Sequence, residues 1–151
     1  MKKLSKKSKK IEQEVLQNYK INSPSKLPLE NKDYLKEYFL KREKLFRDCL
    51  KLPKQVFKNK KILDFGSGTG EHDILYAQWG GMLDLVEINP ISVNQTKKYF
   101  KLFNLSKKIN KIYNKSIFDY SSKNKYDIVI SEGVLHHTDN PKLGFDKLTK
   151  N

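Results

Sequence analysis

The sequence predicts an α/β fold built on a Rossmann-like parallel sheet, and three observations support this. From residue 61 onward, short apolar segments alternate with longer segments that have helical spacing. Alternation of this kind is typical of a parallel sheet with helices on its faces. A glycine-rich turn, "GSGTG", directly follows the first short segment. The chain has 151 residues, enough for one domain with a buried core.

We predict four strands separated by helices in this second part of the chain. The strands are the short segments 61–65, 82–88, 109–117 and 126–133. One helix, 70–81, ends in two glycines, and another, 89–105, opens with Asn89 as an N-cap and Pro90 at the first helical position. Three consecutive apolar residues, 128–130, indicate that the fourth strand is buried on both faces.

The first part of the chain reads as a tail and two helices. Residues 1–10 are rich in lysine and predict a disordered tail. Apolar residues at helical spacing predict a short helix over 11–20 and a longer one over 31–51, with a loop containing proline and serine between them. Cys49 lies on the apolar stripe of the second helix, and we expect it to be a small core side chain.

The composition limits the classes of function. A net charge of +14 makes contact with RNA or an anionic membrane surface worth considering. Nearly all of the positive charge is scattered lysine, as an AT-rich genome would dictate, whereas dedicated phosphate readers favour arginine. We therefore keep nucleic acid as an alternative partner without favouring it. The sequence has no apolar run long enough for a membrane span, no secretory signal and one cysteine, so we expect a cytoplasmic protein.

The glycine-rich turn is the first candidate site. Gly66, Gly68 and Gly70 can adopt backbone angles closed to other residues and let a ligand touch the main chain. A helix that starts near Gly70 offers unpaired N–H groups at its positive end. Since ligands bind at the carboxyl ends of parallel strands, we predict a site for a polar or negatively charged ligand. The spacing differs from the dinucleotide fingerprint and from a P-loop, and a plain glycine-rich turn is the alternative interpretation.

Polar side chains also follow the second and third strands. Glu87 ends the second strand, where a carboxylate can accept both hydroxyls of a ribose in bonds worth about 1.5–3 kcal/mol. The alternative is an exposed acid. After the third strand, Ser116 and the Ile117 N–H could bind an adenine, with Phe118 packed on the base and Asp119 as the other polar candidate. An ordinary strand-to-loop transition explains this segment equally well.

The fourth strand leads into "SEGVLHHTDNP", which carries titratable groups. His136 and His137 are adjacent and cannot point the same way, so one can face a pocket while the other packs or caps. Glu132 or Asp139 could join them at a metal, but adjacent histidines are a weak ligand pattern, and we predict no metal site. His72, near the start of the helix after the glycine turn, is expected to be solvated.

The segments "LDFGSGTGEHD", "VEINP", "NKSIFDY" and "YDIVISEGVLHHTDNP" resemble the successive motifs of class I S-adenosylmethionine-dependent methyltransferases. They are most similar to the small-molecule branch with a "VLHH" motif, and the resemblance covers about residues 58–146. It implies S-adenosyl-L-methionine as the cofactor and the strand order 3-2-1-4, the first four strands of a seven-stranded sheet. It further implies a helical lid over 11–57 and a methyltransferase domain over 58–151 that lacks its last three strands, so we expect a truncated chain.

The resemblance also implies roles for individual residues. The glycine turn would hold the methionine part of the cofactor, Glu87 the ribose, and Ser116 with Ile117 the adenine. The full set of predicted cofactor-binding residues is Asp64, Gly66, Ser67, Gly68, Thr69, Gly70, Glu87, Ile88, Ser116, Ile117 and Glu132. His137, or else His136, would be the general base if the acceptor is a hydroxyl.

We therefore expect an enzyme that transfers a methyl group to a small-molecule, lipid or sugar acceptor. "SEGV" stands where amino-group methylators of DNA and glutamine often carry an Asn-Pro-Pro-Tyr-like motif, which argues against that chemistry. The alternatives are an RNA methyltransferase, or a nonenzymatic module on the same fold that binds RNA or a nucleoside.

Overall fold

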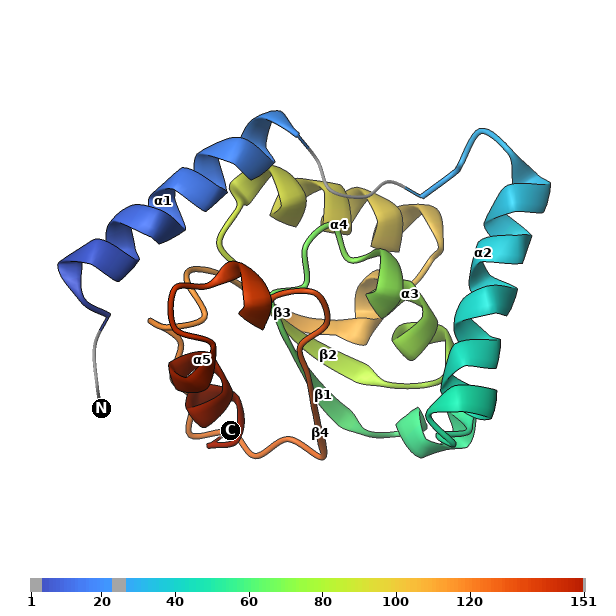
Figure 1. Cartoon of the computed structure of the whole chain (residues 1–151). Coiled ribbons are helices and arrows are strands. Elements are labelled where there is room, and N and C mark those ends of the chain that lie inside the picture. Colours follow the sequence, from blue (N-terminus) through green and yellow to red (C-terminus); the bar gives the residue numbers. More distant parts are fainter. Residues whose placement is uncertain (1–3, 23–26, 151) are drawn as a thin grey trace.

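The computed structural model describes residues 4–22 and 27–150. Its centre is a parallel sheet, in which the strands lie in the order β3-β2-β1-β4 (Figure 1). The strands are β1 (Lys61–Phe65), β2 (Met82–Glu87), β3 (Ile109–Asn114) and β4 (Ile128–Ile130). This is the order predicted from the sequence, so the predicted Rossmann-like α/β fold is confirmed.

Helices precede, connect and follow these strands. The α-helices are α1 (Lys6–Ile21), α2 (Lys32–Lys44), α3 (Glu71–Gln78), α4 (Pro90–Leu102) and α5 (Pro141–Leu148). A π-helix, Leu45–Cys49, continues α2, and 3-10 turns span Lys54–Phe57, Ser106–Lys108 and Leu135–His137. The Asn89 side chain accepts a hydrogen bond from the Ile91 N–H at 3.0 Å, which confirms Asn89 as the N-cap of α4. None of the helices within 4–22 and 27–150 has the length and apolarity to cross a bilayer.

The core consists of two clusters on opposite faces of the sheet, because successive side chains of a strand point to opposite faces. On β1, Ile62 belongs to the cluster that includes Ile74 of α3 and Phe100 of α4. Leu63 and Phe65 belong to the other cluster, against which α5 packs. The sheet is therefore covered on both sides (Figure 1).

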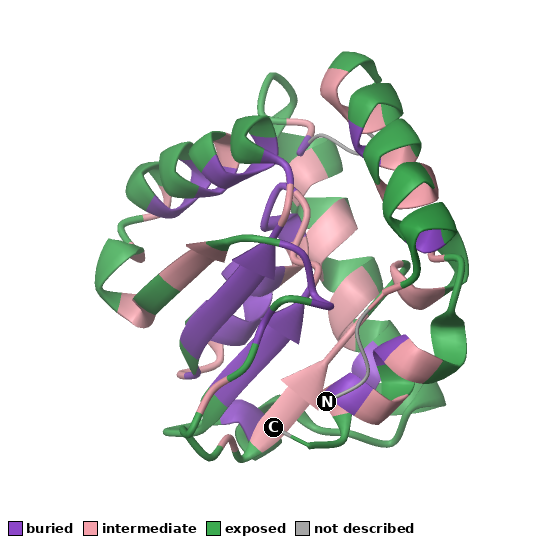
Figure 2. Cartoon of the chain, turned by 90° about the vertical axis from the view of Figure 1, so that its left-hand side faces the viewer, coloured by how far each residue is buried: buried purple, intermediate pink, exposed green. Residues whose placement is uncertain are grey.

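The two middle strands are more deeply buried than β4. Figure 2 shows β1 and β2 almost entirely buried and β4 with intermediate exposure. Residues 128–130 pack against the core on both faces of the sheet, as predicted, but they are only partly buried. The reason is that β4 lies at one end of the strand order and pairs, among the described strands, with β1 alone.

The first helix begins earlier than predicted. α1 starts at Lys6, because the Ser5 hydroxyl accepts a hydrogen bond from the Ser8 N–H at 3.0 Å and caps it. Residues 6–10 are therefore helical and not part of a disordered tail. Residues 1–3 of the predicted tail and residues 23–26 of the predicted loop lie outside the described residues.

The end of the second helix also differs from the prediction. α2 stops at Lys44, and the next five residues form the π-helix. Its wider turn changes the direction in which side chains point, so Phe46 enters the core while Cys49 is exposed. The expectation that Cys49 is a core side chain is wrong.

Candidate functional site

A pocket of about 310 Å³ lies at the carboxyl edge of the sheet, against α1. The loop after β1, the end of β2 and the segments after β3 and β4 form its floor. The α1 residues that line it, at positions 8, 12, 15, 16 and 19, recur at helical spacing, so one face of α1 forms a wall. The pocket is at the edge where the sequence predicted a ligand.

The glycine loop and the acid of β2 meet in this pocket. The Gly68 N–H donates to Glu87 Oε2 at 2.8 Å, and the Asn89 N–H donates to Oε1 of the same carboxylate at 2.7 Å. Burial raises the pKa of Glu87, while the N–H groups of Asn89, Gly68 and Ile88 lower it. The convergence predicted from the sequence is therefore present, because β1 and β2 are neighbouring parallel strands.

The three glycines of the loop serve different needs. All have positive φ, 99° at Gly66, 55° at Gly68 and 73° at Gly70. A Cβ atom on Gly66 would lie 2.6 Å from Val134 Cγ2, and one on Gly70 would lie 2.5 Å from Thr96 Cγ2. A Cβ atom on Gly68 would meet nothing within 4 Å. Gly66 and Gly70 thus allow close packing, whereas Gly68 leaves space for a ligand.

The polar character of the lining indicates which ligand fits. Of the described residues that line the pocket, none is lysine or arginine, and the acids are Glu12, Glu71, Glu87, Glu132 and Asp139. The Ser67 hydroxyl is buried in the lining and has no hydrogen-bond partner among the described residues. The sequence left a polar or a negatively charged ligand open, and this lining favours a neutral or positively charged one, with a polar group that pairs with Ser67.

Asp64 is not part of the pocket. Because side chains alternate along β1, Asp64 lies on the same face as Ile62, beneath α3, and beside Asp73. Burial raises the pKa of Asp64 to about 7, against the influence of Asp73 and His72, and it raises the pKa of Asp73 as well. The expectation that Asp64 touches the cofactor is therefore not met by this geometry.

The remaining predicted residues divide between the pocket lining and the structure behind it. Those in the lining are Ser67, Thr69, Ile88, Ile117, Glu132 and His137. Gly70, Ser116 and His136 are not in the lining. His137 lines the pocket, with its ring edge-on to Tyr19 at 5.8 Å between centroids, whereas His136 lies outside the lining and packs its ring against His137 at 3.9 Å between centroids.

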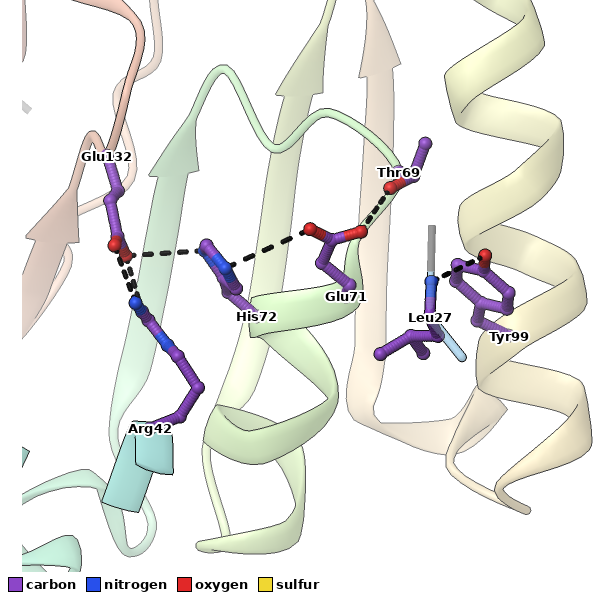
Figure 3. A network of polar contacts seen from close by, with 7 residues as sticks. All are labelled: Leu27, Arg42, Thr69, Glu71, His72, Tyr99 and Glu132. Carbon is purple, nitrogen blue, oxygen red and sulfur yellow. Dashed lines mark hydrogen bonds and ion pairs between the residues drawn. The ribbon is translucent and has the colours of Figure 1, made fainter. Parts of the chain in front are cut away.

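Sequence reasoning missed a chain of ionic contacts beside the pocket (Figure 3). Arg42 Nη1 and Nη2 donate to the two oxygens of Glu132 at 2.7 and 2.6 Å, and His72 Nδ1 lies 3.3 Å from the same carboxylate. These contacts, with His72 the stronger, lower the pKa of Glu132 to about 2 against the effect of burial. Glu71 lies next in the chain, with its Oε1 3.9 Å from His72 Nε2 and its Oε2 accepting from the Thr69 hydroxyl at 2.8 Å.

The expectation that His72 is merely solvated is wrong. Its ring stacks on Tyr38 of α2, it lines the pocket, and it contacts Glu132 after β4. The sequence signal for the Arg42–Glu132 contact was Arg42 itself, because the chain has only two arginines. Its partner, 90 positions later in the sequence, could not be identified without the fold. Among the residues that the structure describes, no group of three or more acidic, histidine or cysteine side chains could hold a metal ion.

Comparisons with known proteins agree with this architecture. The structure is similar to Arabidopsis thaliana protein arginine methyltransferase 10, with 28% identity and a TM-score of 0.50, over 69% of this chain and 27% of that one. It is similar to the Trypanosoma brucei PRMT1 enzyme–prozyme complex with AdoHcy, with 28% identity and a TM-score of 0.50, over 65% and 30% of the two chains. The StiE O-MT region shares the fold, with 19% identity and a TM-score of 0.62, over 88% and 46%.

The chain thus spans less than half the length of these three proteins. A search among curated proteins found no match. The family model described as "Methyltransferase domain" matches residues 34–150, which include most of α2 and the whole sheet. The chain therefore belongs to the methyltransferase domain family, within the class I S-adenosylmethionine-dependent methyltransferases.

Proposed function

We propose that this chain binds S-adenosylmethionine in the pocket and takes part in methyl transfer to a small-molecule, lipid or sugar acceptor. The observation that carries the proposal is the Glu87 carboxylate, held on the Gly68 and Asn89 N–H groups at the wall of the pocket. A carboxylate fixed in this way has lone pairs directed at the pocket, where the two hydroxyls of a ribose can donate to them.

The order of the strands supports one orientation of the cofactor. The adenine would lie after β3, near Ile117 and Phe118, and the ribose at the end of β2 on Glu87. The methionine part would lie on the loop after β1, where Gly68 leaves space and the Ser67 hydroxyl needs a partner. A sulfonium and an amino group are both cationic, and the acidic lining without lysine or arginine suits them.

When bound, the cofactor would supply an electrophilic methyl group, and the residues of this chain would bind it, orient it and exclude water from it. Positioning of this kind can contribute about 7–11 kcal/mol to a barrier. α1 would form the lid over the cofactor, as part of the proposed lid segment 11–57. The acceptor would lie after β4, where His137 lines the pocket.

His137 would accept the proton of a hydroxyl acceptor in this arrangement. The neighbouring His136 lies outside the lining, but its ring packs on that of His137 at 3.9 Å between centroids, so His136→Ala tests support of the His137 ring. With an identified acceptor, we expect His137→Ala to lower turnover at least tenfold and His136→Ala to lower it less. Equal turnover in wild type and His137→Ala would exclude the general-base role.

Isothermal titration calorimetry with S-adenosylhomocysteine tests the proposed function. We expect micromolar binding by the wild type, and about 10- to 100-fold weaker binding by Glu87→Ala, since bonds to a charged group contribute about 1.5–3 kcal/mol. Glu14→Ala, an exposed acid on α1, is the control that should bind normally. No binding by folded wild type would contradict the proposal.

The alternative, an RNA methyltransferase or a nonenzymatic module that binds RNA or a nucleoside, is supported by the net charge of +14. The described lining offers no lysine or arginine for a phosphate, so RNA would have to bind elsewhere on the surface. Titrating RNA at several salt concentrations distinguishes the proposals. Salt-sensitive RNA binding without affinity for S-adenosylhomocysteine would favour the nonenzymatic module.

A further inference from the structure

One carboxylate of the pocket comes from the lid helix instead of the sheet. Glu12 of α1 lines the pocket, and its Oε1 accepts a hydrogen bond from the Ser116 hydroxyl at 2.5 Å. Ser116 follows β3, so this bond joins segments 104 positions apart in the sequence. Glu12 therefore lies at the β3 end of the pocket, where the adenine of the proposed cofactor would be.

The Ser116 hydroxyl is already engaged and lies behind the lining. It donates a hydrogen bond to Glu12 and accepts one from the Phe118 N–H at 3.1 Å. A serine hydroxyl has only one proton to donate, and Ser116 is buried outside the lining. Glu12 Oε2, in contrast, accepts no hydrogen bond from the residues that the structure describes. The acceptor presented to a ligand at this end is thus Glu12.

We propose that Glu12 recognises the exocyclic amino group of the cofactor's adenine, and that Ser116 positions its carboxylate. This inference rests on the proposed function. The amino group is a hydrogen-bond donor, and Glu12 Oε2 can accept from it. Ile117 and Phe118, both in the lining, offer an apolar surface beside it for the base.

The surroundings of Glu12 give this bond a physical reason. Burial raises the pKa of Glu12, and the nearby Asp119 raises it further, while the Ser116 hydrogen bond and Lys9 lower it. A partly buried carboxylate with a free oxygen gains from a second donor. Because Glu12 belongs to α1, recognition of the base would also hold the lid helix against the sheet.

An analogue that lacks the amino group tests the proposal directly. S-inosylhomocysteine carries a carbonyl oxygen where S-adenosylhomocysteine carries the amino group, so the donor becomes an acceptor. We expect wild type to bind the adenosyl compound at least tenfold more tightly in calorimetry. Glu12→Gln, whose amide can donate as well as accept, should lose this preference.

Two further variants make the test specific. Glu14→Gln is the same substitution on the same helix at a side chain that is 65% exposed, and it should keep the wild-type preference. Ser116→Ala should bind both compounds more weakly but keep most of the preference, because Glu12 remains. Circular dichroism would establish that each variant is folded.

The outcomes separate this inference from the proposed function. If wild type binds S-adenosylhomocysteine and Glu12→Gln keeps the full preference for it, the role of Glu12 is wrong and the proposed function stands. Loss of the preference in Ser116→Ala but not in Glu12→Gln would assign recognition to Ser116. If folded wild type binds neither compound, the proposed function and this inference both fail.

Discussion

Two buried carboxylates near the ends of neighbouring strands have opposite surroundings. Glu87 on β2 accepts hydrogen bonds from two backbone N–H groups and faces the pocket. Asp64 on β1 lies beneath α3, has an oxygen with no partner among the described residues, and lies beside Asp73, which is buried with neither oxygen paired. The N–H groups partly offset the effect of burial on the pKa of Glu87, whereas burial dominates at Asp64 and Asp73, and Asp64 raises the pKa of Asp73 further.

The comparison indicates where this fold maintains a negative charge. At the pocket, the main chain supplies donors, so an anion is available for a ligand. Beneath α3, burial outweighs the opposing influence of Asp73 and His72 on Asp64, so the protonated form is favoured. The same kind of side chain can therefore serve recognition on one side of the glycine loop and reduce stability at neutral pH on the other.

We expect the larger change in the free energy of unfolding for Asp73→Asn. The pKa of Asp64 is raised to about 7 and that of Asp73 is also raised, so between about pH 4 and pH 7 the folded chain binds more protons than the unfolded chain. The free energy of unfolding of wild type should therefore fall as the pH rises through this window. Asp73→Asn removes one acid, and we expect a gain of roughly 2 kcal/mol at pH 8 that disappears near pH 4.

Urea denaturation at a series of pH values measures this difference. Glu14→Gln on the exposed face of α1 controls for the loss of one negative charge. A gain that is the same at pH 4 and pH 8 would show that the raised pKa values of the two aspartates do not cause it.

For Glu87→Gln we expect a smaller change in the free energy of unfolding, of the opposite sign. Both Glu87 oxygens accept from N–H groups, so an amide can satisfy one of them while its own NH₂ group meets the other N–H. We expect a loss of about 1 kcal/mol in the free energy of unfolding, measured by the same urea denaturation without ligand. If Glu87→Gln instead stabilised the protein as much as Asp73→Asn does, the contrast between the two carboxylates would be false.

Much of the fold was predictable because its signals are local. Apolar segments, the glycine turn and the cap at Asn89 are each contained in a few neighbouring residues. The meeting of Gly68 with Glu87 followed from one further step, since consecutive strands of an α/β fold commonly pair. The face on which the Asp64 side chain lies was also predictable, because alternation along the strand places it on the same face as Ile62.

The contacts from the N-terminal helices could not be predicted in this way. Arg42 reaches Glu132, and Glu12 reaches Ser116, across 90 and 104 positions of sequence. Such contacts depend on how α1 and α2 are placed against the sheet, and helical periodicity gives the face of a helix but not its partner. The exposure of Cys49 was not predicted for a related reason, because a π-helix is not evident from apolar spacing.

The pocket walls come from segments that lie between residues 4 and 139 of the chain. A cofactor bound there would hold the first helix, the glycine loop and the segment after β4 together. The melting temperature would then report how much of the protein has cofactor bound. A free cofactor concentration of a hundred times the dissociation constant adds about 2.7 kcal/mol to the free energy of unfolding. In a cell, the lifetime of this chain against proteolysis would rise and fall with its supply of methyl donor.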